Sequence, residues 1–116
     1  MPFKRGDVVL VLFPDSNLRT AKRRPALVVQ ANNLAAGLAQ TIVAMITSNM
    51  ARAGHPSRVT LVKDSTAGRR AGILMDSVIM TDNLATIRET EIDRAIGTLT
   101  DMAEVNDALL HTLGLS

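Results

Sequence analysis

The stretch Asp7–Phe13, with the sequence DVVLVLF, is the part of the chain that most strongly indicates its fold. It is rich in β-branched residues, too short for a typical helix, and entered through the turn-forming pair Gly6-Asp7. Its apolar residues are nearly continuous rather than alternating, which is typical of a fully buried strand. We therefore expect a buried strand here, with other strands arranged around it.

The next two apolar runs predict the neighbouring strands. The segment Asp15–Lys22 lies between the first apolar run and the second. It is polar and turn-forming, and we expect it to be a long exposed loop. Pro25 is expected to open a second strand that runs to Gln30, because a proline is tolerated where no ladder donor is needed. Thr41–Thr47, with the sequence TIVAMIT, predicts a third strand in a central position.

Shorter strands are predicted further along the chain. They cover Arg58–Val62, Ile73–Met80 as one long strand or two, and Leu84–Ile87. The segment Asp64–Gly72 is polar, contains two glycines and is expected to be a link between strands.

Only the C-terminal segment has a clear helical pattern. Asp101 and Glu104 have the spacing of a capping box, apolar residues recur every three or four positions from Met102 to Leu113, and Gly114 is placed to end the helix. We predict a mainly β fold: a small barrel of about six to seven strands with a C-terminal α-helix, forming a single domain over residues 1–116.

Composition and missing motifs exclude several classes of protein. The 116 residues are 47% hydrophobic and 21% charged, and no apolar run approaches the roughly 20 residues that span a bilayer. The N-terminus lacks the features of a signal peptide, so we expect a mature cytoplasmic protein. Cysteine is absent, and the chain has no HExxH, GxxxxGK[ST], GxSxG or GxGxxG motif. We therefore expect neither a metal site nor another cofactor.

The charge is distributed unevenly. The net charge is +4 over residues 1–30, +4 over residues 31–75 and −6 over residues 76–116. One interpretation is a basic surface for a polyanion; the other is solvated charge in loops. With only two aromatic residues, stacking platforms for single strands are not expected, so recognition of a polyanion would depend on arginine and lysine.

Two pairs of residues at strand ends suggest a phosphate site. Arg23 and Arg24 directly precede Pro25, and Thr47 and Ser48 end the third strand. A hydroxyl there is often only a strand terminator that bonds to the local backbone. If the second and third strands end at the same rim, however, Arg24 and Thr47 converge on one phosphate. His55, in a loop, is either an ordinary loop residue or a proton donor, because its unperturbed pKa is about 6.5.

These residues lie in a series of short motifs that resembles the MazF/PemK family, the toxin half of type II toxin–antitoxin pairs. The matching segments are Gly6–Val11, Arg24–Val29, Ala44–Ser48, Ser57–Val59, Gly72–Leu74, Asp76–Ile79 and Leu84–Ile87. The resemblance implies an SH3-like barrel and a sequence-specific, metal-independent endoribonuclease that acts on single-stranded RNA. Attack by a ribose 2′-OH would leave a 2′,3′-cyclic phosphate and a 5′-OH.

The same resemblance implies roles for individual residues and partners. Arg24 and Thr47 match the catalytic arginine and hydroxyl residue, and Asp82 matches a recurring carboxylate, with an ordinary turn aspartate before Asn83 as the alternative. Ser48 and His55 are candidates for catalysis or orientation from their own chemistry rather than from the resemblance. In relatives the loop that corresponds to Asp15–Lys22 lies over the RNA groove, so Arg19 and Lys22 are expected RNA contacts. Charge alone adds Arg23, Arg58, Arg69 and Arg70 to the expected contacts. The expected partners are a second copy of the chain, as a homodimer, and an antitoxin with a disordered acidic tail.

The sequence also departs from the family pattern. Ala85 and Met80 occupy positions where relatives carry basic residues, so those residues' roles do not transfer to this chain. Two other functions stay open: a non-catalytic SH3-like module that binds nucleic acid or protein, and a toxin of the same fold that poisons DNA gyrase. The pairing of Arg24 with Thr47 favours the nuclease.

Overall fold

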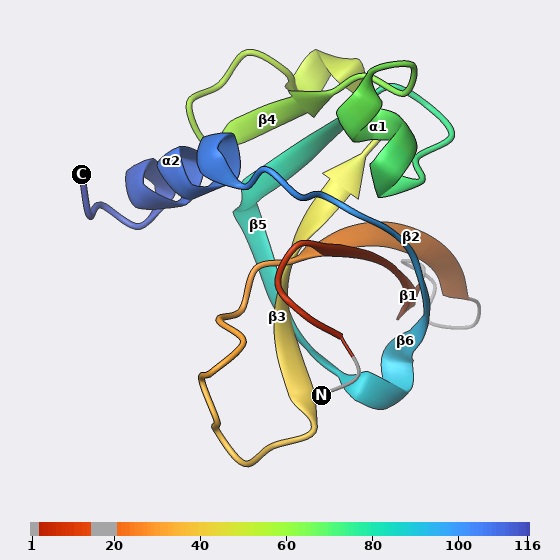
Figure 1. The fold of residues 1–116 in the computed structure, drawn as a ribbon, viewed down its shortest axis with the longest axis vertical. Coiled ribbons are helices and arrows are strands. Elements are labelled where there is room, and N and C mark those ends of the chain that lie inside the picture. Colours follow the sequence, from red (N-terminus) through yellow and green to blue (C-terminus); the bar gives the residue numbers. More distant parts are fainter. Residues whose placement is uncertain (1–2, 15–20) are drawn as a thin grey trace.

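A computed structural model describes residues 3–14 and 21–116, which form one antiparallel sheet with a C-terminal helix (Figure 1). The six strands have the order β4-β5-β3-β2-β1-β6. Their bounds are β1 Asp7–Pro14, β2 Ala21–Val28, β3 Gln40–Thr47, β4 Arg58–Leu61, β5 Ser77–Arg88 and β6 Ile92–Thr98. Two helices, α1 Thr66–Ala71 and α2 Ala103–Thr112, and two short 3₁₀ turns, Met50–Arg52 and Glu89–Glu91, complete the described elements.

The buried strand β1 contributes to two hydrophobic cores. Val8 belongs to a core that includes Val105 and Ala108 of α2, whereas Val9 and Val11 belong to a second core with residues of β2, β3, β5 and β6. Because alternate residues of a strand point to opposite faces, a strand with a core on each side needs apolar residues at every position. This explains the consecutive apolar residues Val8 and Val9 and the apolar residue at Val11.

The sheet curls around the second core, and α2 packs against β4 and β5 (Figure 1). Within the described residues the hydrogen-bonded order ends at β4 and β6, so the strands form a small-barrel-like fold rather than a ring closed by backbone bonds. The prediction of a mainly β fold with a C-terminal helix is confirmed. No helix in the described part of the chain is long and apolar enough to span a membrane.

The predicted start of the second strand is wrong. β2 begins at Ala21 and contains Pro25, which lies opposite Leu10 of β1. On the other side, β2 pairs with β3 only over Ala26–Val28. The missing N–H of Pro25 therefore interrupts no bond to β3, and a proline is accommodated inside the strand.

Four other local features differ from the predictions. The supposed link Asp64–Gly72 contains α1, β6 was not foreseen, and Ile73–Met75 is a bend rather than part of a strand. The capping box at Asp101 does not form, because α2 begins at Ala103 and the Asp101 carboxylate accepts a hydrogen bond from that residue's N–H (3.0 Å).

The predicted end of the terminal helix is correct. Gly114 has a positive φ of 70°, and its N–H bonds to the His111 carbonyl. The Leu115 N–H bonds to the carbonyl of Leu110. These two bonds form a Schellman motif, in which a glycine supplies the left-handed conformation.

Two fully buried threonines provide a stability test. Among the described residues, the Thr41 hydroxyl has no hydrogen-bond partner, whereas the Thr81 hydroxyl donates to the Ser57 carbonyl and lies 2.7 Å from the Thr112 hydroxyl. Thr41→Val should leave the free energy of unfolding unchanged or raise it by about 1 kcal/mol, and Thr81→Val should lower it by about 1 to 3 kcal/mol. Urea denaturation of both variants checks this, and equal losses would contradict it.

Candidate functional site

A groove of about 480 Å³ opens where strands β1, β2, β3 and β6 meet the bend before β5. Its lining combines basic, hydroxyl and apolar groups: Leu10, Arg23, Arg24, Pro25, Ile46, Thr47, Ser48, Gly72, Ile73, Leu74, Met75, Ser77, Arg94 and Ile96. The groove therefore holds both strand-end pairs that the sequence singled out.

The register of β2 and β3 explains why Arg24 and Thr47 meet. Ala26 pairs with Met45, and this is the last pair of the ladder. Extending the register by two residues sets Thr47 opposite Arg24. The ladder does not extend that far, because β2 there follows β1 alone, and the space between the two strand ends becomes part of the groove.

Thr47 is suitably placed to donate a hydrogen bond into the groove. It is half-buried at the end of β3, and its hydroxyl oxygen accepts the Asn49 N–H at 3.1 Å. The local backbone bond expected of a strand terminator is therefore present. Because that bond uses only an oxygen lone pair, the hydroxyl hydrogen is left for an anionic ligand.

The far wall of the groove is held by a close contact between α1 and β6. Gly72 follows α1 with a positive φ of 74°, and a Cβ there would collide with the Ile96 carbonyl. A Cβ on Gly97 would collide with the backbone of Arg70 and Ala71. Larger residues would push α1 off the sheet, so the two glycines fix the bend that carries Leu74 and Met75.

The groove lining is strongly basic. Three arginines, Arg23, Arg24 and Arg94, line it, and no Asp or Glu is among the described lining residues. Sequence reasoning missed Arg94 because it lies in the acidic C-terminal third of the chain. The arrangement suits a phosphodiester, whose charge guanidinium forks bind well.

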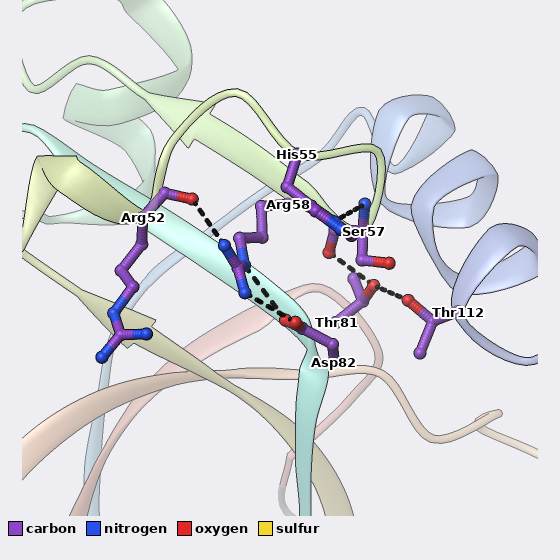
Figure 2. Close-up of polar contacts among 7 residues, drawn as sticks. All are labelled: Arg52, His55, Ser57, Arg58, Thr81, Asp82 and Thr112. Carbon is purple, nitrogen blue, oxygen red and sulfur yellow. Dashed lines mark hydrogen bonds and ion pairs between the residues drawn. The ribbon is translucent and has the colours of Figure 1, made fainter.

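A second, smaller pocket adjoins the groove and shares Thr47 with it. It has a volume of about 360 Å³ and is lined by Thr47, Asn49, Arg52, Arg58, Met80, Asp82 and Asn83. Arg58 lies between the Arg52 carbonyl and the Asp82 carboxylate (Figure 2). Its Nε and Nη2 donate to the two Asp82 oxygens at 3.3 and 2.8 Å, which makes a bidentate ion pair.

The ion pair favours the charged form of Asp82. Hydrogen bonds from the Arg58 guanidinium hold the pKa of the Asp82 carboxyl below its ordinary value. Asp82 is therefore ionised at neutral pH. The stability that this pair contributes is present above the ordinary Asp pKa of about 3.9 and is lost as the pH falls through the lowered value.

His55 lies on the side of the second pocket that faces α2, and it lines neither the groove nor the pocket. Its Nδ1 accepts the Ser57 N–H at 3.0 Å (Figure 2). Its ring packs edge-on to His111, with the ring centroids 6.3 Å apart. Nδ1 is thus an acceptor, which places the proton of the neutral ring on Nε2.

The other predicted RNA contacts are dispersed. Lys22 is exposed on β2, while Arg69 and Arg70 are exposed in the last turn of α1 and do not line the groove. Arg19 lies outside the described residues. Within the described chain, no three His, Asp or Glu side chains are grouped as metal ligands.

Comparison with known proteins assigns the chain to a family. Residues 4–113 match the model of the PemK-like, MazF-like toxins of type II toxin–antitoxin systems. The chain belongs to the PemK/MazF toxin family. It is 37% identical over 101 residues to Endoribonuclease MazF6 of Mycobacterium tuberculosis and to Endoribonuclease MazF2 of Mycobacterium bovis, an alignment that covers 86% of this chain and 79% of each relative.

Solved structures of PemK/MazF toxins share the fold. A mycobacterial endoribonuclease in complex with its cognate antitoxin superposes with a TM-score of 0.74 at 22% identity, covering 98% of this chain and 97% of that one. A MazE–MazF structure from Deinococcus radiodurans gives a TM-score of 0.73 at 23% identity and covers 98% of both chains.

The ionised state of Asp82 leads to a test of its role. Asp82→Asn should lower RNA cleavage severalfold, because Arg58 loses its carboxylate, without changing the shape of the pH–rate profile between about pH 5 and pH 9. The cleavage rate of both proteins across this range is the measurement. Loss of a limb of the profile in the variant would identify Asp82 as a proton carrier.

Proposed function

We propose that this PemK/MazF toxin cleaves single-stranded RNA in the cytoplasm as a sequence-specific, metal-independent endoribonuclease of one domain. The observation that carries the proposal is the position of Arg24 and Thr47 across one groove whose described lining has three arginines and no acid. Family membership and relatives named as endoribonucleases support the same activity.

The proposed reaction is an internal transesterification. The ribose 2′-oxygen attacks the adjacent phosphorus and loses its proton to a base, while the bond from phosphorus to the 5′-oxygen breaks and that oxygen takes up a proton. The products are a 2′,3′-cyclic phosphate and a 5′-OH. Negative charge grows on the non-bridging oxygens in the transition state, so donors fixed beside them lower the barrier.

Arg24 and Thr47 are assigned to those non-bridging oxygens. A guanidinium has a pKa above about 12 and does not accept a proton at neutral pH, so Arg24 acts as a charged donor rather than as a base. Thr47 donates its hydroxyl hydrogen. Ser48 lines the same groove and is a further orienting donor.

Asp82 is assigned an orienting role. Its carboxylate fixes Arg58 at the wall of the pocket that shares Thr47 with the groove. Met80 lines that pocket where some relatives carry a basic residue, so the cations of this pocket come from Arg52 and Arg58 instead. His55 remains the candidate proton donor, and it would have to approach the RNA from outside the groove.

The proposed partners follow from the charge of the groove. Relatives have been solved with a cognate antitoxin or with MazE. An antitoxin with an acidic tail would be attracted to the arginines for the same reason as RNA, and its binding should prevent cleavage. We also propose a homodimer as the active form.

Incubation of the purified protein with a long single-stranded RNA in EDTA tests the activity. Discrete cuts that leave 5′-OH ends are expected. Intact RNA at high protein concentration would instead support a non-catalytic binding module, and inhibition of DNA gyrase without RNA cleavage would support a gyrase poison.

Single substitutions test the two assigned donors. Arg24→Ala and Thr47→Ala should each reduce the cleavage rate by roughly a hundredfold to a thousandfold, as does the loss of one transition-state donor in other enzymes. Both residues lie outside the cores, so thermal melting should be nearly unchanged. Wild-type rates in both variants would show that the site lies elsewhere.

A further inference from the structure

Arg94 and Arg23 share one carboxylate beside the groove. Arg23 Nε lies 3.2 Å from Asp93 Oδ2, and Arg94 Nη1 donates to the same oxygen at 2.9 Å. Arg23 comes from β2 and the other two residues from β6, so the contact crosses the intervening strand β1. We call Arg23, Asp93 and Arg94 the arginine clasp.

A β-bulge makes this contact possible. Leu10 pairs with Arg94 and Val11 with Ile92, so Asp93 is the extra residue of β6. In a regular strand successive side chains point to opposite faces, and neighbours such as Asp93 and Arg94 would point apart. A bulge changes the direction in which a side chain points, and here the Asp93 carboxylate lies beside the guanidinium of Arg94, the next residue in the chain.

Stability alone does not account for the clasp. The Arg23 and Arg94 side chains are 59% and 64% exposed, and ion pairs this exposed contribute about 0 to 1 kcal/mol. The clasp also brings two cations against one anion, which leaves a local excess of positive charge. Both arginines line the groove that contains Arg24, so this excess faces the ligand.

We propose that the arginine clasp is an RNA-backbone site, in which Arg94 binds a phosphate next to the scissile one and Asp93 is a positioning residue. β6 and β2 flank β1, so their backbones lie about 10 Å apart at two strand spacings. One strand of RNA in the groove can thus contact Arg24 at the scissile phosphate and Arg94 at a neighbour. The inference rests on the proposed function. It extends that function by placing the bound RNA strand across β6 as well as beside Arg24.

The experiment measures binding separately from cleavage. The probe is a 2′-O-methyl oligoribonucleotide with the base sequence that the wild-type protein cleaves. It retains every phosphate and has no 2′-OH to react. Its affinity is measured between about 50 and 200 mM salt, where each lost phosphate contact reduces the slope of log K against log salt by about 0.7. Cleavage of the matching unmodified RNA is measured in parallel.

Arg94→Ala should weaken binding roughly tenfold at low salt, reduce the slope by about 0.7, and lower the cleavage rate at sub-saturating RNA by a similar factor. The matched control is Arg88→Ala, which removes the same charge from an exposed residue at the end of β5 that does not line the groove. Arg88→Ala should change neither the affinity for the probe nor the slope of log K against log salt. Wild-type affinity and slope in Arg94→Ala would overturn the proposal.

Asp93→Ala distinguishes positioning from simple charge. Removing an acid beside a polyanion site should tighten RNA binding if Asp93 only contributes charge. If it holds the two arginines in place, binding should weaken severalfold despite the gain in net charge. Tighter binding would overturn the positioning role, and melting curves establish that each variant is folded.

Two further outcomes keep this inference separate from the proposed function. A wild-type protein that binds the probe with a clasp-dependent slope but never cuts RNA refutes the nuclease and retains the phosphate site. If Arg94→Ala instead loses affinity for an acidic peptide such as oligoglutamate but not for the probe, the clasp serves a protein partner and the RNA assignment is wrong.

Discussion

Pro25 has no backbone N–H, and the ladder between β2 and β3 ends beside it, at Ala26. Beyond this point β2 stays bonded to β1 while β3 turns toward Ser48. The two strand ends remain in register but are no longer joined by backbone bonds, and the groove opens between them. A guanidinium and a hydroxyl that are distant in the sequence therefore lie on the two sides of one site.

The remaining structure holds these two strand ends rigid. Val8 of β1 packs into one core and Val9 and Val11 pack into the other, and β1 in turn pairs with β2 from Val8 to Pro14. Gly72 and Gly97 let α1 approach β6 closely and so fix the opposite wall of the groove. Of the groups proposed to contact the RNA, Arg24 is exposed and Thr47 is half-buried, whereas the strands that carry them are packed against the cores. Such pre-organisation allows donors to act without rearrangement.

The success of prediction from sequence depended on how regular each segment is. β1 and β3 were foreseen because their apolar runs are nearly continuous, and the convergence of Arg24 and Thr47 on one groove was predicted because they lie near the ends of such runs. β6 was missed because two register shifts break its period-two pattern, and α1 because it has only six residues, including Gly68. Arg94 was missed because it lies in β6, and because the net charge of residues 76–116 is negative and does not reveal a single arginine.

The central claim is that Arg24 and Thr47 act on the same scissile phosphate. A double-mutant cycle of cleavage rates with Arg24→Ala, Thr47→Ala and the combined variant tests it most directly. Groups that stabilise one transition state together are strongly non-additive, so the combined variant should be at least about tenfold more active than the product of the single effects predicts. Effects that multiply independently would show that the two residues do not share a phosphate, and would contradict this account.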